Sequence, residues 1–375
     1  MGSNSKNGGL PAVKEPWIKT PLVESAALSK VAGCRIFLKL ENLQPSGSFK
    51  SRGIGNLIRQ AIISRPSPSN LHFYSSSGGN AGLACVTAAR TLGYPATVVV
   101  PFSTKPMMIA KIKTAGATNV IQIGASWYEA DKHLREEILA KDPNGVYVPP
   151  FDHPDIWTGA ATMVDEIAQQ LTYQKPDAII CSVGGGGLFT GLMEGLDRVY
   201  KHDRPVDVLA VETQGAESLH KSLEAGKLEA LDRITSIATS LGAIKVAEKA
   251  FQYAQKPNVK SVVLSDGEAA TACVRFADEE RMIVEAACGA SVAVCYQGKL
   301  KKLLPKLTAE SKVIVVVCGG SNINLGMLEE YRETYGKEGI STNAGGVVSN
   351  GVEHKMNKYS ADGIKDLRED LGYPC

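Results

Sequence analysis

The residue best suited to covalent chemistry in this sequence is Lys50, which stands in a turn-forming segment from Pro45 to Gly53. Proline and glycine in that segment end the alternating strand Arg35 to Leu40, and helix-compatible residues follow from Gly55 to Ile63. Lys50 is therefore expected at the start of a helix, where the positive end of the dipole disfavours its charge. Phe49 is bulky enough to exclude water from it. Both effects lower the pKa of a lysine and make a nucleophilic amine, although an ordinary surface lysine is the alternative.

Two glycine-rich turns follow, each between a predicted strand and a predicted helix. The first runs from Ser76 to Gly82 and contains Asn80, and the second runs from Ser182 to Leu188 with glycine at every position from 184 to 187. Backbone N–H groups at a helix N-terminus bind anions, and successive residues without a Cβ let amides converge on a phosphate. Both turns therefore favour an anionic ligand, while a tight turn with an asparagine cap remains the alternative for the first.

The run of four glycines has two further interpretations. A dinucleotide site would use Glu212 as the ribose acid, but Phe189 and Thr190 stand where the third glycine of that motif belongs. A close crossing of helix and strand is the purely structural alternative, although interior glycine then costs about 1 kcal/mol without compensation. A phosphate group is the favoured ligand.

A third turn, Cys318 to Asn322, closes the apolar strand Val313 to Val317. Ligands of open α/β sheets bind at strand C-termini, although a cysteine there is more often a small buried hydrophobe. The segments Glu212 to Ser218 and Ser240 to Ala243 look by themselves like a strand end and two loops, with Glu212 as a solvated acid.

The segment Ser48 to Gly53 resembles the Ser-Phe-Lys-x-Arg-Gly motif of fold-type-II pyridoxal-phosphate (PLP) enzymes, most closely the L-serine/L-threonine dehydratases of catabolic type. The resemblance extends from about Ile18 to Leu328 and includes both glycine turns. It implies an α/β fold like the tryptophan synthase β chain, with two doubly wound open-sheet domains, the smaller inserted in the larger. It also implies PLP as cofactor, with Lys50 as Schiff-base residue and general base.

The resemblance assigns roles to residues at matching positions. The implied cofactor-binding residues are Phe49, Lys50, Asn80, Gly184, Gly185, Gly186, Gly187, Leu188 and Cys318. The implied substrate-binding residues are Ser77, Gly78, Gly79, Asn80, Ala81, Phe151 and Ser240. The implied ligands of a monovalent cation such as K⁺ are Gly184, Glu212, Ala216, Ser218, Leu241 and Ala243.

The implied reaction is β-elimination of L-serine or L-threonine to pyruvate or 2-oxobutanoate plus ammonia. In the resembled enzymes a serine or cysteine at the position of Cys318 faces the pyridine nitrogen. A thiol is neutral at pH 7 and cannot keep that nitrogen protonated, which suits elimination over transamination. The alternatives are a β-replacement enzyme like cysteine synthase, a dehydratase for another β-hydroxy amino acid, a non-catalytic PLP- or amino-acid-binding relative, and a dinucleotide oxidoreductase.

The sequence departs from the family pattern at two positions. Gly78 stands where the dehydratases usually have alanine, and Ala286 replaces a usual proline in Val284 to Gly289. Glycine widens the accessible backbone conformations and removes a methyl contact. We therefore expect lower serine turnover than in an alanine-bearing relative and more room for larger or differently oriented β-hydroxy amino acids. Gly78→Ala should raise kcat on L-serine and narrow the substrate range.

Short apolar segments alternate with amphipathic ones, which predicts doubly wound α/β layers. The predicted strands, besides Arg35 to Leu40, are Leu71 to Ser75, Ala96 to Val100, Val120 to Ile123, Ala178 to Val183, Val206 to Val211 and Val313 to Cys318. The predicted helices are Ala81 to Leu92, a helix capped by Ser126 and running to Lys141, Trp157 to Leu171 and Leu188 to Tyr200.

A length of 375 residues predicts two or three domains. Mapping the resemblance onto the chain gives a large PLP-binding domain from 1–42 and 153–335, and a small domain from 43–152, with a proline-rich crossing near residue 150. The segment 336–375 reads as a partly flexible extension with a possible short helix at 362–371, too short for a regulatory domain.

Composition limits the partners. The net charge is +2 without a long basic run, so nucleic acid is not expected, and no apolar stretch is long enough to span a membrane. The polar N-terminus, residues 1–9, does not resemble a signal peptide. The 8 cysteines are scattered without a Cys-x-x-Cys pair, which favours reduced thiols in the cytoplasm. We expect a homodimer acting on a small amino acid.

Overall fold

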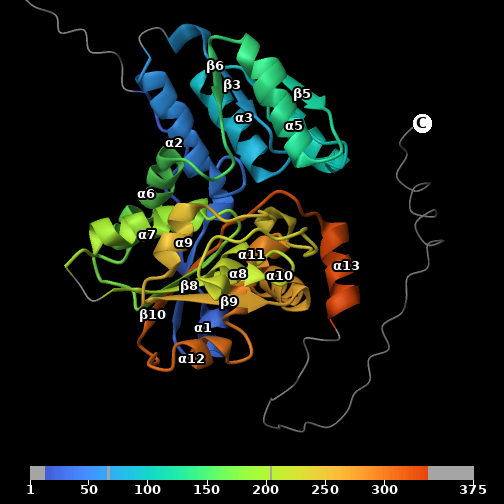
Figure 1. The fold of residues 1–375 in the computed structure, drawn as a ribbon. Helices are drawn as coiled ribbons and strands as arrows, with labels where there is room; N and C mark the ends of the chain where they lie inside the picture. Colours follow the sequence, from blue (N-terminus) through green and yellow to red (C-terminus); the bar gives the residue numbers. More distant parts are fainter. Residues whose placement is uncertain (1–12, 66–67, 203–204, 337–375) are drawn as a thin grey trace, which may run out of the picture. The chain divides into compact units, whose positions relative to one another are not determined.

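The computed structural model describes residues 13–65, 68–202 and 205–336, which build two β-sheets with their helices (Figure 1). The first sheet has six strands in the order β1-β2-β10-β7-β8-β9, all parallel except the edge strand β1. Its strands are β1 (Leu22–Glu24), β2 (Arg35–Lys39), β10 (Lys312–Val316), β7 (Ala178–Ser182), β8 (Asp207–Thr213) and β9 (Val259–Leu264).

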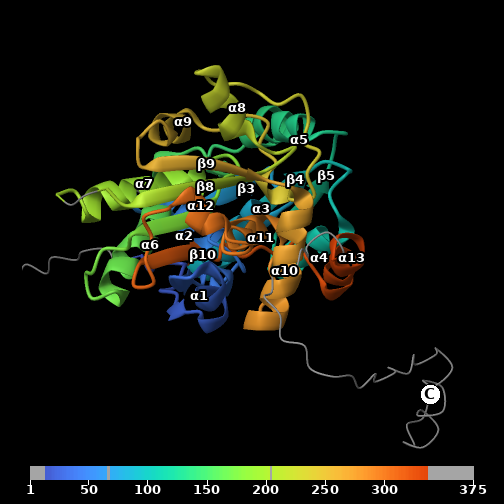
Figure 2. The ribbon, with the colours of Figure 1, turned by 90° about the horizontal axis from the view of Figure 1, so that it is seen from below.

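Helices cover both faces of this sheet. In Figure 2, α8 and α9 lie on one side of β8 and β9, and α10 and α11 lie on the other. The chain runs from β7 through β8 to β9 in one direction along the sheet and returns from β9 to β10 in the other, and right-handed crossovers of opposite direction place their helices on opposite faces. The helices of this part are α1 (Ala26–Ala32), α7 (Gly187–Val199), α8 (Ser218–Ala225), α9 (Glu248–Ala254), α10 (Asp266–Glu280), α11 (Ala286–Ala293), α12 (Lys299–Leu303) and α13 (Leu325–Tyr335).

The second sheet has four parallel strands in the order β5-β4-β3-β6. Its strands are β3 (His72–Ser75), β4 (Ala96–Val100), β5 (Asn119–Gln122) and β6 (Gly145–Tyr147), and the helices around it are α2 (Lys50–Ile63), α3 (Asn80–Leu92), α4 (Pro106–Thr114) and α5 (Trp127–His133). Helix α6 (Pro154–Gln170) leads from this part of the chain into the six-stranded part.

Each sheet has its own hydrophobic core. Strand β10 is buried from Val313 to Val316, as a central parallel strand covered on both faces should be. Helix α6 contributes to both cores, because Ile156 packs with the residues of the four-stranded sheet and Met163 and Ile167 pack with those of the six-stranded sheet. One helix thus joins the two cores.

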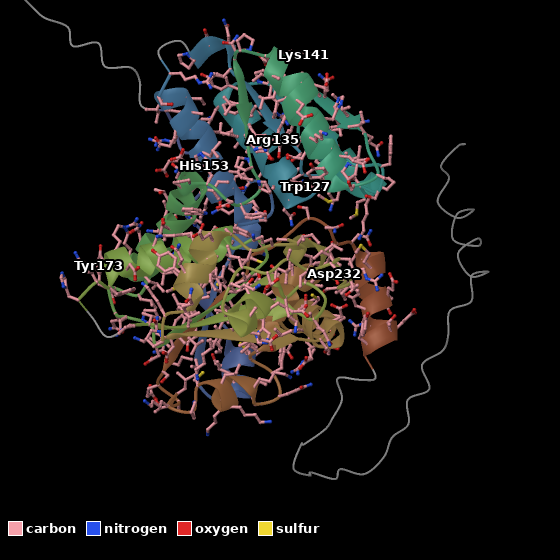
Figure 3. The ribbon with its side chains drawn as sticks, viewed as in Figure 1. Trp127, Arg135, Lys141, His153, Tyr173 and Asp232 are labelled. Carbon is pink, nitrogen blue, oxygen red and sulfur yellow. The ribbon has the colours of Figure 1, made fainter. Side chains whose placement is uncertain are left out.

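The C-terminal edge of the four-stranded sheet faces the six-stranded part. In Figure 3, Trp127 at the start of α5 lies on the side toward the larger sheet, and Lys141 lies at the opposite end of that segment. Because α5 follows β5, the strand ends of this sheet, and the loops after them, point into the region between the two sheets. Ligand sites of open α/β sheets lie at such an edge.

The strands predicted from sequence are all present, with small shifts at their ends. Three others were missed, namely β1, β6 and β9. The helix capped by Ser126 is confirmed at its start but is irregular, because a π-helical turn, Leu134–Ile138, and a 3₁₀ turn, Leu139–Lys141, follow α5. The polar N-terminus and the possible helix at 362–371 lie outside the described residues. No helix among the described residues is long and apolar enough to cross a membrane.

Candidate active site

Lys50 is the first residue of α2, as the sequence predicts. The turn before it is hydrogen-bonded to the turn after β10. The Phe49 N–H donates to the Cys318 carbonyl at 3.1 Å, and the Gly320 N–H donates to the Gly47 carbonyl at 2.9 Å. Segments far apart in sequence are thereby joined, and Lys50 lies near Cys318.

The environment of Lys50 favours its neutral amine. Burial lowers its pKa from 10.5 to about 8, and the Cys318 thiol group opposes this shift. The Lys50 Nζ donates a hydrogen bond to the Pro150 carbonyl and lies 5.2 Å from the centre of the Phe49 ring. An amine with this pKa is partly unprotonated near neutral pH and can act as nucleophile or base.

A buried ion network anchors the helix that carries Lys50. The Arg52 Nε donates to Glu41 Oε2 at 2.7 Å, and its Nη1 donates to Glu166 Oε1 at 2.7 Å. Lys39 also pairs with Glu166, at 2.6 Å. Arg52 belongs to the lysine motif, whereas its two carboxylate partners were missed because nothing in sequence links positions 41 and 166. The network holds the first turn of α2 against the six-stranded sheet and α6.

The four glycines link β7 to α7, which begins at Gly187. A Cβ at any of the last three would collide with a neighbouring residue, and one at Gly184 would be in tight contact with Leu241, at 3.0 Å. A Cβ at Gly185 would overlap the Phe151 ring, and one at Gly186, whose φ is +95°, would overlap Ala250. The Thr190 hydroxyl, in the first turn of α7, is buried with no hydrogen-bond partner among the described residues. A turn of glycines at a helix N-terminus, beside an unsatisfied hydroxyl, fits the phosphate of PLP.

Asn80, the first residue of α3, connects the two sheets. Its Nδ2 donates to Glu285 Oε1 at 2.6 Å and to the Ser240 hydroxyl at 3.2 Å, and its Oδ1 accepts from the Ser321 N–H at 2.8 Å. Both amide hydrogens of Asn80 are already used in these bonds. Asn80 can therefore donate to another acceptor only by giving up one of them. The predicted site residues Asn80 and Ser240 are thus in direct contact.

Glu285 is a site residue to which the sequence analysis assigned no role. Burial raises its pKa, while hydrogen bonds from Ser240, Asn80 and the Asn322 N–H favour the ionised form. The distance from the Asn322 N–H to Glu285 Oε2 is 3.2 Å. An acid inside the apolar stretch 284–288 was the available signal, because a buried carboxylate needs dedicated partners.

In the Ser77-to-Asn80 turn, Gly79 has room for a side chain and Gly78 does not. A Cβ at Gly79 would meet only the Ser77 hydroxyl, at 3.8 Å, whereas a Cβ at Gly78 would lie 2.5 Å from Thr104 Cγ2. Ala81 is buried in the first turn of α3. The turn therefore offers space for a ligand at Gly79 and not at Gly78.

Cys318 is buried at the end of β10, and its Sγ lies 3.5 Å from the Ser182 hydroxyl at the end of β7. Its contact with Cys288 and burial together raise the pKa of the Cys288 thiol. The neighbouring strands β10 and β7 therefore bring Cys318 next to the start of the four-glycine turn, which begins two residues after Ser182.

The residues implied as cation ligands fall into two groups at adjacent strand ends. Gly184 lies against Leu241, since an added Cβ would be 3.1 Å from the Leu241 carbonyl oxygen, and Ala243 follows in the same turn. Glu212 accepts hydrogen bonds of 2.8 Å from the N–H groups at the start of α8, near Ala216, and burial raises its pKa to about 8. The Ser218 hydroxyl is buried without a partner among the described residues.

Comparison with known proteins shows the family of this chain. A family model described as pyridoxal-phosphate dependent enzyme matches residues 13–319. The chain belongs to the pyridoxal-phosphate dependent enzymes. Within this family it is 43% identical over 333 residues to a catabolic L-serine/threonine dehydratase of Saccharomyces cerevisiae, covering 85% of this chain and 92% of that one. It is 42% identical to the human L-serine dehydratase/L-threonine deaminase, covering 85% and 95%.

A solved structure is similar in fold. It is a fungal L-serine ammonia-lyase from Rhizomucor miehei, which superimposes with a TM-score of 0.79 at 40% identity. The match covers 86% of this chain and 100% of that chain. The predicted PLP cofactor and fold class are therefore confirmed.

Proposed function

We propose that this chain is a PLP-dependent L-serine/L-threonine ammonia-lyase that forms pyruvate or 2-oxobutanoate and ammonia. The observation that carries the proposal is a low-pKa lysine at the start of α2, joined to the Cys318 turn, in a chain with the fold and lysine motif of this family. The names of the relatives support the substrate class.

PLP, when bound, supplies an electron-withdrawing ring next to the substrate Cα. The residues that would hold it are Lys50 as the covalent anchor, Phe49, Asn80 and Cys318 around the ring, and the N–H groups of residues 184–188 for the phosphate. The four-glycine turn supports this assignment because a side chain would collide at three of its positions and would be tightly packed at the fourth.

Residues of the Ser77-to-Ala81 segment would bind the substrate carboxylate through their N–H groups at the start of α3, where the helix dipole favours an anion. Phe151 and Ser240 border the same space, since Phe151 packs on the four glycines and Ser240 bonds to Asn80. These contacts would orient the substrate.

Lys50 would then act as the general base. Its neutral amine would take the proton from the substrate Cα, the β-carbon–oxygen bond would break, and the Lys50 ammonium would give its proton to the leaving hydroxyl. Water is then released and the amine is neutral again. The resulting enamine hydrolyses to the oxo acid and ammonia. Burial of the amine keeps it unprotonated at a pH where a free lysine would be charged.

The decisive experiments are borohydride reduction of the purified holoenzyme followed by peptide mapping, and a separate assay of the unreduced holoenzyme. We expect PLP to be fixed on the peptide that contains Lys50, and L-serine to give pyruvate at a rate that sulfide does not change. Label on another lysine refutes the assignment of Lys50. Formation of cysteine at the expense of pyruvate when sulfide is added supports a β-replacement enzyme instead.

We also propose that residues 1–42 and 153–335 form one domain and residues 43–152 another, because the two hydrophobic cores divide the chain near these bounds.

The K⁺ site is a proposal that rests on the family resemblance and on the buried oxygens of Glu212 and Ser218. A homodimer rests on the resemblance alone, and light scattering tests it. A cytoplasmic location is supported by the free, buried thiols of the described cysteines.

A further inference from the structure

The turn that would bind the substrate carboxylate lies beside the loop after the next strand. Strands β3 and β4 are paired in parallel, with Ser75 opposite Val98. Their C-terminal ends therefore lie at the same edge, and the turn from Ser77 to Asn80 lies beside the loop that contains Thr104. Sequence alone gives no reason to connect Gly78 with Thr104.

Thr104 fills the space that a side chain at position 78 would need. A Cβ at Gly78 would lie 2.5 Å from Thr104 Cγ2, 2.8 Å from its Oγ1 and 3.2 Å from its Cβ. Real Cβ atoms essentially never approach other atoms within 3.0 Å, so either the Thr104 side chain or one of the two loops would have to move. The room created by glycine at position 78 is thus occupied by protein and is not available to a larger substrate.

Thr104 is poorly able to move away. Its N–H donates to the Pro101 carbonyl at 3.1 Å and closes a turn within the loop, and the Phe102 N–H donates to the Gly124 carbonyl at 3.0 Å and ties the loop to the segment after β5. Threonine is β-branched and has few allowed χ1 rotamers. Its hydroxyl has no hydrogen-bond partner among the described residues, so the side chain contributes to the loop through packing alone.

We propose that Thr104 is a positioning residue for the substrate carboxylate, acting through the shape of its side chain on Gly78. In this pair, the Thr104 side chain packs into the space that the missing side chain of Gly78 leaves free. This contact fixes the backbone conformation of the Ser77-to-Asn80 turn. This inference rests on the proposed carboxylate-binding role of that turn. It reverses the expectation from sequence that Gly78→Ala raises serine turnover.

The pairing itself is tested without cofactor or substrate, by thermal denaturation of four apoproteins: the unchanged protein, Gly78→Ala, Thr104→Ala, and the double variant. We expect Gly78→Ala to lower the Tm by a few degrees, roughly what overpacking costs in a protein of this size. In the Thr104→Ala background the same change should lower the Tm by less than half as much. Equal losses in the two backgrounds overturn the pairing.

The role in substrate binding is tested by steady-state kinetics of the holoenzymes on L-serine. Removing the γ atoms in Thr104→Ala loosens a contact made before and during the reaction, so KM should rise about threefold to tenfold while kcat changes little. Gly78→Ala displaces the turn and should lower kcat/KM at least tenfold, on the order expected for a misplacement of less than 1 Å. The double variant should recover to within about threefold of Thr104→Ala.

Thr104→Val is the matched control, because valine keeps the shape and removes only the hydroxyl. We expect its KM and Tm to stay close to those of the unchanged protein. A KM increase in Thr104→Val as large as in Thr104→Ala would assign a direct polar contact instead and overturn the steric account.

Gly79→Ala separates failure of this inference from failure of the proposed function. Its methyl group enters open space with a negative φ of −109°, so the Tm should be unchanged while KM for serine rises strongly. If Gly79→Ala leaves KM unchanged, the turn does not bind the carboxylate and the proposed role of the turn fails. If Gly79→Ala raises KM but the Gly78 and Thr104 variants leave it unchanged, the turn binds the carboxylate and only the positioning role of Thr104 fails.

Discussion

At the scale of single residues, the titration of Lys50 can be measured before any cofactor is bound. Burial lowers its pKa to about 8, so in the apoprotein its reaction with an amine-acylating reagent should rise with pH around a midpoint near 8. The extent of labelling is read by mass spectrometry of the Lys50 peptide. Exposed Lys141, in the same digests, serves as the internal reference. A midpoint near 10 at Lys50 would contradict the desolvation seen here.

A second prediction for a single residue concerns the thiol of Cys318. Replacing Cys318 by alanine removes a neutral hydrogen-bonding group from the end of β10, a loss of about 1 kcal/mol or roughly fivefold in rate. We expect kcat for serine elimination to fall by about that factor while the PLP absorbance of the purified protein is retained, because the glycine turn supplies most of the binding.

Cys85→Ala is the control for this variant. Cys85 is also a buried free thiol, but it packs in the core of the four-stranded sheet. A loss of stability common to both variants is a packing effect, whereas a loss of kcat in Cys318→Ala alone assigns the thiol to the reaction. Unchanged kcat in Cys318→Ala removes Cys318 from the mechanism.

The sequence alone could predict those site residues whose role follows from the residues next to them in the chain. Lys50 and the four glycines were found this way, and the structure places them at a helix start and in a turn without room for side chains. Glu285 and Thr104 could not be assigned a role, because each depends on a partner in a distant loop. Only the fold brings Glu285 to Asn80, or Thr104 to Gly78.

At the scale of elements, the position of α2 depends on Arg52. Arginine holds Glu41 and Glu166 with a planar group of several donors, and lysine at this position keeps the charge but loses this geometry. We expect Arg52→Lys to lower the free energy of unfolding by about 2 kcal/mol, the scale of a charged hydrogen bond, and to reduce kcat because Lys50 is in the same turn. Urea denaturation and steady-state assays measure the two effects.

Arg59→Lys is the matched control on the same helix. The Arg59 Nε donates only to the Val13 carbonyl, at 2.9 Å, and no carboxylate pairs with it among the described residues. This variant should change stability and kcat much less. If Arg52→Lys and Arg59→Lys behave alike, the buried network does not position Lys50.

The elements that sequence predicted and those that it missed differ in burial. Central strands such as β10 are continuous apolar runs and were found. The missed strands β1, β6 and β9 are short or lie at sheet edges, and most of their residues are only half-buried or exposed. Half-polar edge strands look like loops in a sequence, because only one side of each is paired.

At the scale of the whole molecule, polar contacts bridge the two sheets where the site lies. Asn80 bonds to Glu285, Ser240 and Ser321, and the Lys111 ammonium donates to the Ser321 carbonyl. These bonds come from loops at the facing strand ends. The arrangement of the two sheets therefore determines the geometry of the site, which explains why the motifs were visible in sequence and their mutual contacts were not.

Global stability should depend on pH and K⁺ together, through Glu212. Its pKa is about 8 in the folded protein, against about 4.3 in an unfolded chain. Between these values the folded state holds a proton that the unfolded state has lost, so this group makes the protein less stable as pH rises from about 4.3 to about 8.

A cation beside the Glu212 carboxylate favours its ionised form and binds only the folded state. We therefore expect KCl to raise the Tm of the apoprotein by about 2–5 °C at pH 8 and by less at pH 6. Choline chloride at equal ionic strength corrects for screening. Glu212→Gln should abolish the K⁺ effect, whereas Glu194→Gln, which changes another half-buried carboxyl of raised pKa, should retain it. Equal Tm shifts with K⁺ and choline at both pH values would exclude a cation at Glu212.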